Sequence, residues 1–177
     1  MKYFAYGSNM LLERLRERVP SAAVLGKVKL PGYTLAWNKP SKDGSGKCSI
    51  VKSQDFQSTV WGVLYEIETS EKPNLDKAEG LDYGYTEIKV PIEFMGEIVE
   101  ACTYIATSIN PLLKPYQWYK DFVMQGAKQN KLPTYYISML ETIDTIIDPQ
   151  KPTTTGPTFV LLGLKTLPSQ MQKKTSQ

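Results

Sequence analysis

The order of strand-like and helix-like stretches most constrains the fold of this chain. Short apolar stretches with strand character dominate its first hundred residues, and few helical patterns lie among them. The expected strands are Lys2–Ala5, Val24–Leu30, Tyr33–Trp37, Cys48–Val51, Val60–Ile67, Tyr85–Phe94 and Ile98–Ile105. Many strands with few helices between them favour a mixed α+β domain with a curled sheet over a doubly wound one.

Helical spacing of apolar residues predicts four helices. They are Met10–Arg18, which Pro20 ends, Glu71–Ala78, Tyr116–Gln129, and a fourth that opens at Pro133 and runs to about Ile146. Asn9 or Ser8 is the expected N-cap of the first helix, and Ser70 that of the second, which Gly80 ends. Residues 39–47, rich in glycine, serine and lysine, are an expected loop.

Two parts of unequal size are expected along the chain. Residues 1–148 form one domain, since 177 residues allow a proper core but are few for two domains. Residues 149–177 are a proline- and threonine-rich extension with one expected strand, Thr158–Leu164, and a polar tail.

Composition excludes several classes of protein. No run of about 18 apolar residues could cross a membrane, and the first residues are too polar for a secretory signal. Two cysteines give no disulfide framework and no metal-ligand spacing. The net charge of +3 comes from scattered basic residues, whereas nucleic-acid binders concentrate them on one face. We therefore expect a cytoplasmic protein that binds no nucleic acid and no membrane.

The chain contains no histidine. This absence excludes serine and cysteine nucleophiles that a histidine activates, and zinc sites that contain histidine. Acid–base catalysis near neutral pH must then come from a carboxylate, a tyrosine, a lysine, a cysteine or the substrate itself.

Two features could carry chemistry. Tyr6-Gly7-Ser8-Asn9 lies where a strand leads into a helix, so its backbone N–H groups suit a carboxylate or an oxyanion. Glu79 ends a short helix, where the dipole tends to raise a carboxyl pKa toward that of a general base. Alone, each feature also fits a blander interpretation, a capped turn and a surface glutamate. Cys102 is interpreted as a buried apolar residue.

Three segments together resemble the γ-glutamyl cyclotransferase family. Phe4-Ala5-Tyr6-Gly7-Ser8-Asn9 matches its opening signature, and Leu75–Gly80 followed by Gly84-Tyr85 resembles its catalytic-glutamate segment. Its late helical pair is similar to Tyr119-Lys120, Gly126-Ala127-Lys128, Leu132-Pro133 and Tyr136. The resemblance covers about residues 3–146. The stretch between Gly80 and Ile88 looks about one residue short, so no role is assigned to Tyr85.

The resemblance implies a curled mixed β-sheet or small barrel flanked by helices, with the active site at its mouth. Glu79 is then the catalytic residue that transfers protons. The substrate's γ-glutamyl group lies along Tyr3, Phe4, Ala5, Tyr6, Gly7, Ser8 and Asn9, with Tyr104 and Tyr119 lining the pocket. The α-amino group of the substrate attacks its own γ-carbonyl carbon, so 5-oxoproline forms without a cofactor, a metal or an enzyme nucleophile.

The leaving group stays open at this point. The match favours γ-glutamyl-amino-acid dipeptides, while related members act on glutathione or on γ-glutamylamines. A non-catalytic member that binds a small ligand in the same pocket is a further alternative, against which an intact Glu79 argues. The sequence leaves open whether the chain forms a homodimer.

Overall fold

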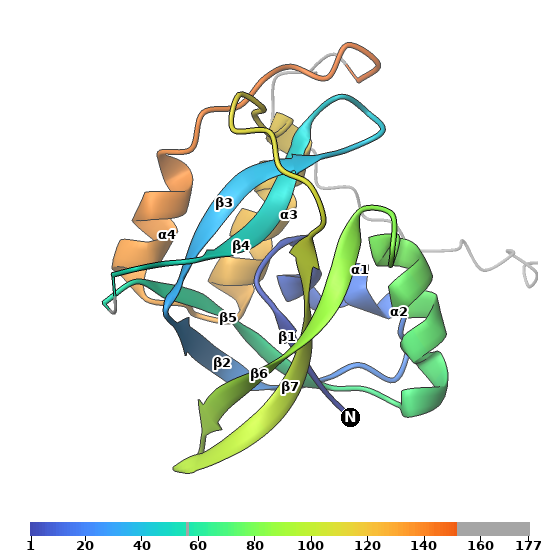
Figure 1. Ribbon diagram of the computed structural model, residues 1–177, viewed down its shortest axis with the longest axis vertical. Helices are drawn as coiled ribbons and strands as arrows, with labels where there is room; N and C mark the ends of the chain where they lie inside the picture. The colour runs from blue at the N-terminus through green and yellow to red at the C-terminus, as the bar shows by residue number, and fades with distance from the viewer. Residues whose placement is uncertain (56, 152–177) are drawn as a thin grey trace, which may run out of the picture.

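The computed structural model describes residues 1–55 and 57–151 (Figure 1). Helical segments are η1 (Ser8–Met10), α1 (Leu12–Arg16), η2 (Thr69–Glu71), α2 (Lys72–Glu79), α3 (Gln117–Gln129) and α4 (Thr134–Glu141). Strands are β1 (Lys2–Ala5), β2 (Ala23–Pro31), β3 (Tyr33–Pro40), β4 (Gly46–Lys52), β5 (Thr59–Glu66), β6 (Tyr85–Phe94) and β7 (Glu97–Ala106). The strand expected at Thr158–Leu164 lies outside the described residues.

The main sheet has five strands in the order β2-β5-β1-β7-β6. It is mixed, because β1 runs parallel to β7 at the pair Tyr3 and Cys102, while the other neighbours are antiparallel. A Cβ on Gly26 of β2 would lie 3.5 Å from the ring of Phe94 on β6, so the two edge strands approach each other. The sheet therefore curls back on itself, and the expected α+β class with a curled mixed sheet is confirmed.

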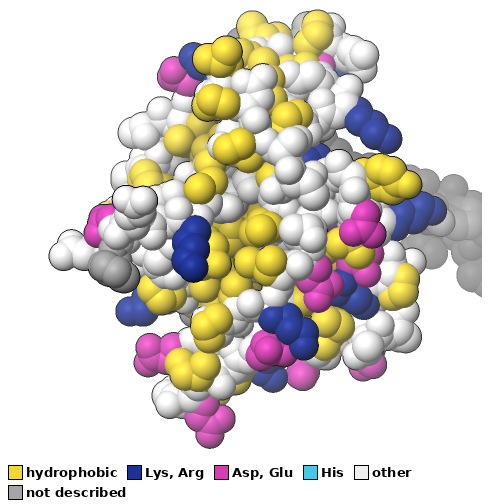
Figure 2. Space-filling model, viewed as in Figure 1, with side chains coloured by type: hydrophobic (Ala, Val, Ile, Leu, Met, Phe, Trp, Pro, Cys, Tyr) yellow, Lys and Arg dark blue, Asp and Glu magenta, His cyan; other side chains and the backbone are white. Residues whose placement is uncertain are grey.

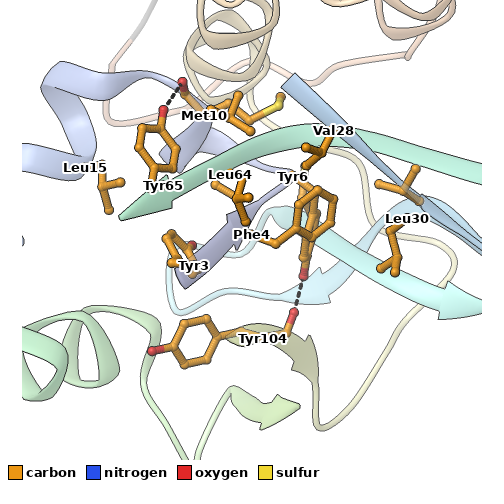
Figure 3. Close-up of a cluster of buried hydrophobic side chains, with 14 of the residues drawn as sticks. Tyr3, Phe4, Tyr6, Met10, Leu15, Val28, Leu30, Leu64, Tyr65 and Tyr104 are labelled. Atoms are coloured by element: carbon orange, nitrogen blue, oxygen red, sulfur yellow. Dashed lines mark hydrogen bonds between the residues drawn. The ribbon is translucent and has the colours of Figure 1, made fainter. Parts of the chain in front are cut away.

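The core fills the inside of this curled sheet (Figure 3). Phe4, Leu30 and Leu64 are fully or almost fully buried. Leu30 follows the alternation of the edge strand β2, whereas Phe4 and Leu64 belong to the inner strands β1 and β5, where successive residues are buried. The Tyr65 hydroxyl donates to the Met10 carbonyl across 2.7 Å, so even the polar tip of this buried ring is satisfied. That bond also ties the short helix η1 to the sheet.

Helices flank the strands, with α4 at one side of the sheet and α2 at the other in Figure 1. Helix α3 packs against η1, and Gly126 makes the close approach possible. A Cβ on Gly126 would lie 2.5 Å from the Leu11 nitrogen and 2.6 Å from the Met10 carbonyl carbon. Glycine is thus required here for space, and α3 supports the turn that follows β1.

Strands β3 and β4 form a separate two-stranded sheet. Their pairing register shifts between Ala36 and Lys39. Ala36 pairs with Ser49 and Lys39 pairs with Lys47, so three residue steps on β3 lie opposite only two on β4. This is a β-bulge, which re-aims the side chains that follow it. The Ala106 N–H of β7 donates to the Ser49 hydroxyl, which joins the small sheet to the large one. The expected loop is also shorter than residues 39–47, since β3 reaches Pro40 and β4 begins at Gly46.

Three expected helix boundaries are wrong. The single helix expected at Met10–Arg18 is instead η1 followed by the short α1, and neither has a side-chain cap. Asn9 and Ser8 do not cap a helix because their side chains bind Glu79, Tyr3 and two arginines. Ser70 lies inside η2 and does not cap α2. The last helix ends at Glu141, and Ile146 lies beyond it in a bridge with Tyr116. Gly80 does end α2, in the left-handed conformation that favours glycine.

On the face shown in Figure 2, hydrophobic side chains gather near the middle, and basic and acidic side chains lie around them. Within the described residues, no helix is long and apolar enough to cross a bilayer.

Candidate active site

One pocket brings together residues from seven segments of the chain. Its volume is about 310 Å³ when its open mouth is included. It is lined by Tyr3, Tyr6, Gly7, Ser8, Asn9, Cys48, Glu79, Tyr85, Tyr104 and Tyr119. A second hollow, between β4 and the end of β7, is lined mainly by apolar side chains and backbone and holds no carboxylate. Polar groups that converge in one cavity mark the first pocket as the candidate site.

Glu79 is the carboxylate of this pocket, and Asn9 holds it in place. Asn9 Nδ2 donates to Glu79 Oε1 across 2.7 Å and to the Tyr3 hydroxyl oxygen across 3.0 Å. Asn9 Oδ1 accepts a hydrogen bond from Arg18 Nη1 at 2.8 Å, which fixes the orientation of the amide. The buried Asn9 side chain thus sets the position of Glu79 relative to the strand–helix turn.

Burial raises the pKa of Glu79 above its ordinary value. The positive charge of Arg18 and the hydrogen bond from Asn9 oppose this rise, as do the more weakly acting Arg14 and Lys39. The cause differs from the helix dipole that the sequence suggests, because the carboxyl loses water when the pocket forms. A carboxyl with a raised pKa is suited to take up and release protons near neutral pH.

Two tyrosine hydroxyls are fixed by the backbone of Cys48. The Cys48 N–H donates to the Tyr119 hydroxyl oxygen across 3.1 Å, and the Tyr85 hydroxyl donates to the Cys48 carbonyl across 2.7 Å. Burial raises the pKa of both tyrosines, so both stay protonated. Tyr119 accepts one hydrogen bond and keeps its own proton, as Tyr3 does beside Asn9. These two hydroxyls can therefore donate to a ligand.

Tyr104 is held in the pocket by hydrogen bonds to Asp76 and Tyr6. Its hydroxyl donates to Asp76 Oδ1 across 2.6 Å, and its carbonyl accepts a hydrogen bond from Tyr6. Lys72 bridges Asp76 and Glu87, which links α2 to β6. This network orients the ring of Tyr104 in the pocket.

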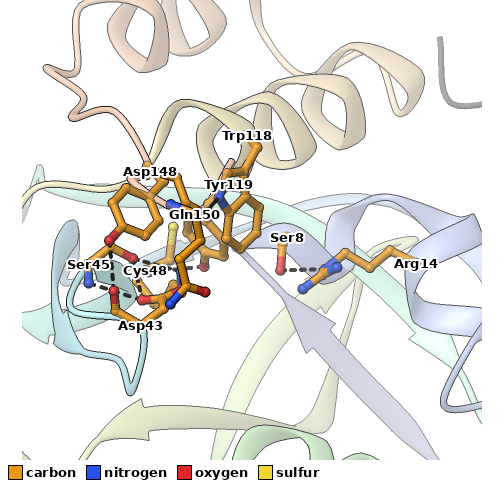
Figure 4. Close-up of polar contacts among 11 residues, drawn as sticks. Ser8, Arg14, Asp43, Ser45, Cys48, Trp118, Tyr119, Asp148 and Gln150 are labelled. Atoms are coloured by element: carbon orange, nitrogen blue, oxygen red, sulfur yellow. Dashed lines mark hydrogen bonds and ion pairs between the residues drawn. The ribbon is translucent and has the colours of Figure 1, made fainter. Parts of the chain in front are cut away.

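The turn at the end of β1 is open to the pocket. A Cβ on Gly7 would lie 3.1 Å from Cys48 Cβ and 3.4 Å from the Tyr119 hydroxyl, so glycine keeps this space free. Among the described residues, the backbone N–H groups of Ser8 and Asn9 meet no acceptor. Arg14 Nε donates to the Ser8 hydroxyl across 3.0 Å, which places a cation beside the turn (Figure 4).

Most of the residues expected at the site lie in this pocket, namely Glu79, Tyr3, Tyr6, Gly7, Ser8, Asn9, Tyr104 and Tyr119. Phe4 and Ala5 do not line it. Both are buried in β1, where Phe4 packs beside the Tyr6 ring. Sequence reasoning gave no role to Tyr85 and none to Cys48, yet both line the pocket. The match of Gly84-Tyr85 to the family could have indicated that Tyr85 lines the pocket, whereas no local pattern marks Cys48.

Cys48 and Cys102 are both buried, and burial raises the pKa of each thiol to about 12. A thiol with so high a pKa is a poor nucleophile, and Cys102 packs as an apolar residue, as expected. Within residues 1–55 and 57–151, no group of three or more acidic or cysteine side chains is placed to hold a metal ion.

The chain is similar in sequence to known proteins over most of its length. A model of the AIG2-like family matches residues 59–140. Gamma-glutamylcyclotransferase of Bos taurus is 34% identical over 149 residues, which are 80% of this chain and 78% of that protein. The protein of the same name from Homo sapiens is 34% identical over 151 residues, with the same coverage of both chains.

Solved structures share the fold. One titled gamma-glutamyl cyclotransferase superposes with a TM-score of 0.75 at 32% identity and covers 82% of this chain and 89% of its own. A yeast gamma-glutamyl cyclotransferase specific to glutathione superposes with a TM-score of 0.57 at 13% identity, covering 79% of this chain and 93% of its own. The second likeness extends to the fold alone.

Proposed function

Since this chain belongs to the γ-glutamylcyclotransferase family, we propose that its pocket closes a γ-glutamyl group into 5-oxoproline and releases the attached amine. The observation that carries this proposal is the position of Glu79, a partly buried carboxylate with a raised pKa that Asn9 holds beside an open turn. The reaction is a lyase-type cyclisation, and its product would place the enzyme in the turnover of γ-glutamyl compounds such as glutathione.

The reaction balances without water. The α-amino nitrogen of the substrate attacks its γ-carbonyl carbon, so one C–N bond forms and the amide C–N bond breaks. One proton leaves the attacking nitrogen and one is gained by the departing nitrogen. Because the nucleophile belongs to the substrate, the enzyme needs to fold the chain over. Well-oriented intramolecular reactions reach effective molarities on the order of 10⁵–10⁸ M.

Glu79 carries the proton between the two nitrogens. Its carboxylate takes the proton of the attacking α-amino group and then delivers it to the leaving amine. A pKa above the ordinary value makes the protonated form a usable intermediate near neutral pH. Positioned general acid–base groups contribute roughly 10²–10⁴-fold in rate.

The turn and the tyrosines stabilise the charges that the substrate brings or develops. The N–H groups of Ser8 and Asn9 are candidates to receive the oxyanion of the tetrahedral intermediate, where one good donor contributes about 10²–10³-fold. The hydroxyl protons of Tyr3 and Tyr119 remain available for the α-carboxylate of the γ-glutamyl group. Arg14 and Arg18 add positive charge on this side of the pocket.

The experiment that tests the proposal compares a γ-glutamyl dipeptide with its N-acetyl analogue and identifies the products by mass. Acetylation removes the nucleophile, so the analogue should bind without reacting. The dipeptide should give 5-oxoproline and a free amino acid in equal amounts. Free glutamate as the main product, or rapid turnover of the acetylated analogue, would show hydrolysis and exclude this function. Binding without any product would point to a non-catalytic member of the family.

A further inference from the structure

Lys39 owes its orientation to the β-bulge in β3. The bulge inserts one extra residue between Ala36 and Lys39, so the side chain of Lys39 does not follow the alternation of the strand before it. Bulges near active sites commonly re-aim a side chain in this way. The segment that the sequence marks only as a loop therefore positions a cation.

The ammonium of Lys39 lies at the pocket. Its Nζ is 4.8 Å from the ring centroid of Tyr85, which lines the pocket. A Cβ on Gly84 would lie 2.8 Å from Lys39 Nζ and 3.7 Å from the Glu79 carbonyl oxygen. The ammonium thus rests on Gly84, close to the end of α2 that carries Glu79. A residue larger than glycine at position 84 would displace it.

Within the described residues, Lys39 forms no ion pair and its Nζ donates no hydrogen bond. The lysines that lie nearest along the chain differ from it. Lys47 is paired with Asp43, and Lys42 is exposed on the loop. Desolvation lowers the pKa of the partly buried Lys39 ammonium, and the nearby negative charge of Glu79 opposes this without forming an ion pair with it. The open mouth of the pocket is where an anionic group could reach it.

We propose that Lys39 is a specificity-determining residue that binds the carboxylate of the leaving amino acid. This inference rests on the proposed function, which places the γ-glutamyl group inside the pocket. The leaving group must then lie at the mouth of the pocket. Gly7, Ser8 and Glu79 mark this mouth, because they are the lining residues that are partly exposed. Lys39 lies over the ring of Tyr85, whereas Arg14 is bound to Ser8, so the two cations have different contacts at the pocket.

The consequence is a preference for γ-glutamyl-amino acids over γ-glutamylamines. An amino-acid leaving group has a carboxylate that can form an ion pair with Lys39. A simple amine has none, so Lys39 stays unpaired. A hydrogen-bonded charge pair of this kind corresponds to about tenfold to hundredfold in kcat/KM. Most of this difference should lie in KM, because the carboxylate is distant from the bonds that form and break.

The test uses two substrates that differ by one carboxylate, γ-glutamylalanine and γ-glutamylethylamide. We expect the wild-type protein to prefer γ-glutamylalanine at least tenfold in kcat/KM. Lys39→Met keeps a side chain of similar length without the charge and should lose about tenfold or more on γ-glutamylalanine, mainly through KM. On γ-glutamylethylamide its loss should be much smaller, and the part of the loss that both substrates share measures the effect of Lys39 on Glu79. Circular dichroism shows whether the variant is folded. Lys39→Arg should retain most of the preference.

Lys42→Met is the matched control, since it removes the same charge from an exposed position nearby. It should leave both substrates unchanged. Equal efficiency of the wild-type protein on the two substrates, or an equal loss on both in Lys39→Met, would overturn the role of Lys39 while the cyclisation itself stands. If neither substrate gives 5-oxoproline, the proposed function fails and this inference fails with it.

Discussion

Asn9 donates a hydrogen bond to Glu79 across 2.7 Å, which joins the turn after β1 to the end of α2. The two residues are 70 positions apart in the chain. The same amide group also donates to Tyr3, so one side chain holds both the carboxylate and a hydroxyl of the pocket. The geometry of the site therefore depends on how firmly the turn and α2 are held against each other.

Replacing Glu79 by glutamine should lower kcat by about two to four orders of magnitude. The amide keeps the shape and can still accept the bond from Asn9, but it cannot carry a proton. KM should change much less. Steady-state kinetics on a γ-glutamyl dipeptide checks this, and a folded Glu79→Gln protein with more than a third of wild-type turnover would contradict it.

Replacing Asn9 by alanine should lower kcat about tenfold to hundredfold, because Glu79 loses a hydrogen bond that orients its charged form. The same bond lowers the pKa of Glu79, so its loss should raise that pKa further. The acidic limb of the kcat/KM profile should then move to higher pH. Asn74→Ala, on the exposed side of α2, is the control. An unchanged pH profile in Asn9→Ala would count against this role.

The raised pKa of Glu79 also predicts how stability depends on pH. The protonated carboxyl is favoured in the folded state, so its contribution is fully present below about pH 4.5, the ordinary value. It is lost as pH rises through the higher pKa of the folded protein. Glu79→Gln stays uncharged and should therefore be more stable than wild type at neutral pH, by about 1.4 kcal/mol for each unit of the shift.

Urea unfolding of both proteins at pH 4 and pH 7 measures this difference. The two free energies of unfolding should converge at the lower pH and separate at the higher one. A wild-type protein that is the more stable of the two at pH 7 would show that the pKa of Glu79 is not raised.

Replacing Gly126 by alanine should weaken both folding and activity. The new Cβ would meet the backbone of Met10 and Leu11 at less than 3 Å, so α3 must move away from η1. Such overpacking costs about 1–3 kcal/mol, and the movement displaces the turn that holds Asn9. Gln125→Ala, on the exposed face of α3, should leave both quantities unchanged. Thermal unfolding and kcat of the two variants give the comparison, and full activity in Gly126→Ala would refute the link.

Local sequence patterns predicted the strands well, because alternation and turn residues act over a few positions. The strand expected at Tyr85–Phe94 has the same bounds in the structure. Gly80 ends α2 as expected, since the left-handed conformation favours glycine. The predicted N-caps were wrong because the side chains expected to cap the first helix form tertiary hydrogen bonds instead. Asn9 and Ser8 have the chemistry of N-caps, but their side chains are used in the site.

The remaining parts of the site depend on tertiary contacts that no local pattern contains. Lys39 reaches the pocket through a bulge in β3, and Tyr85 through its bond to a strand 37 positions away. The raised pKa of Glu79 likewise arises from burial, which the sequence around Glu79 does not specify. Resemblance to a family pointed to Glu79, which lies in the pocket, while the surroundings of Glu79 required the fold.

The attachment of Tyr85 and Tyr119 to the main chain of Cys48 has a consequence for how this enzyme could change. Because the peptide groups of residue 48 hold both rings, a change of its buried side chain to one of similar size removes neither hydrogen bond. Substitution at this position could therefore reshape one wall of the cavity while the catalytic apparatus stays intact. Position 48 is thus a natural starting point for laboratory evolution toward bulkier or smaller substrates.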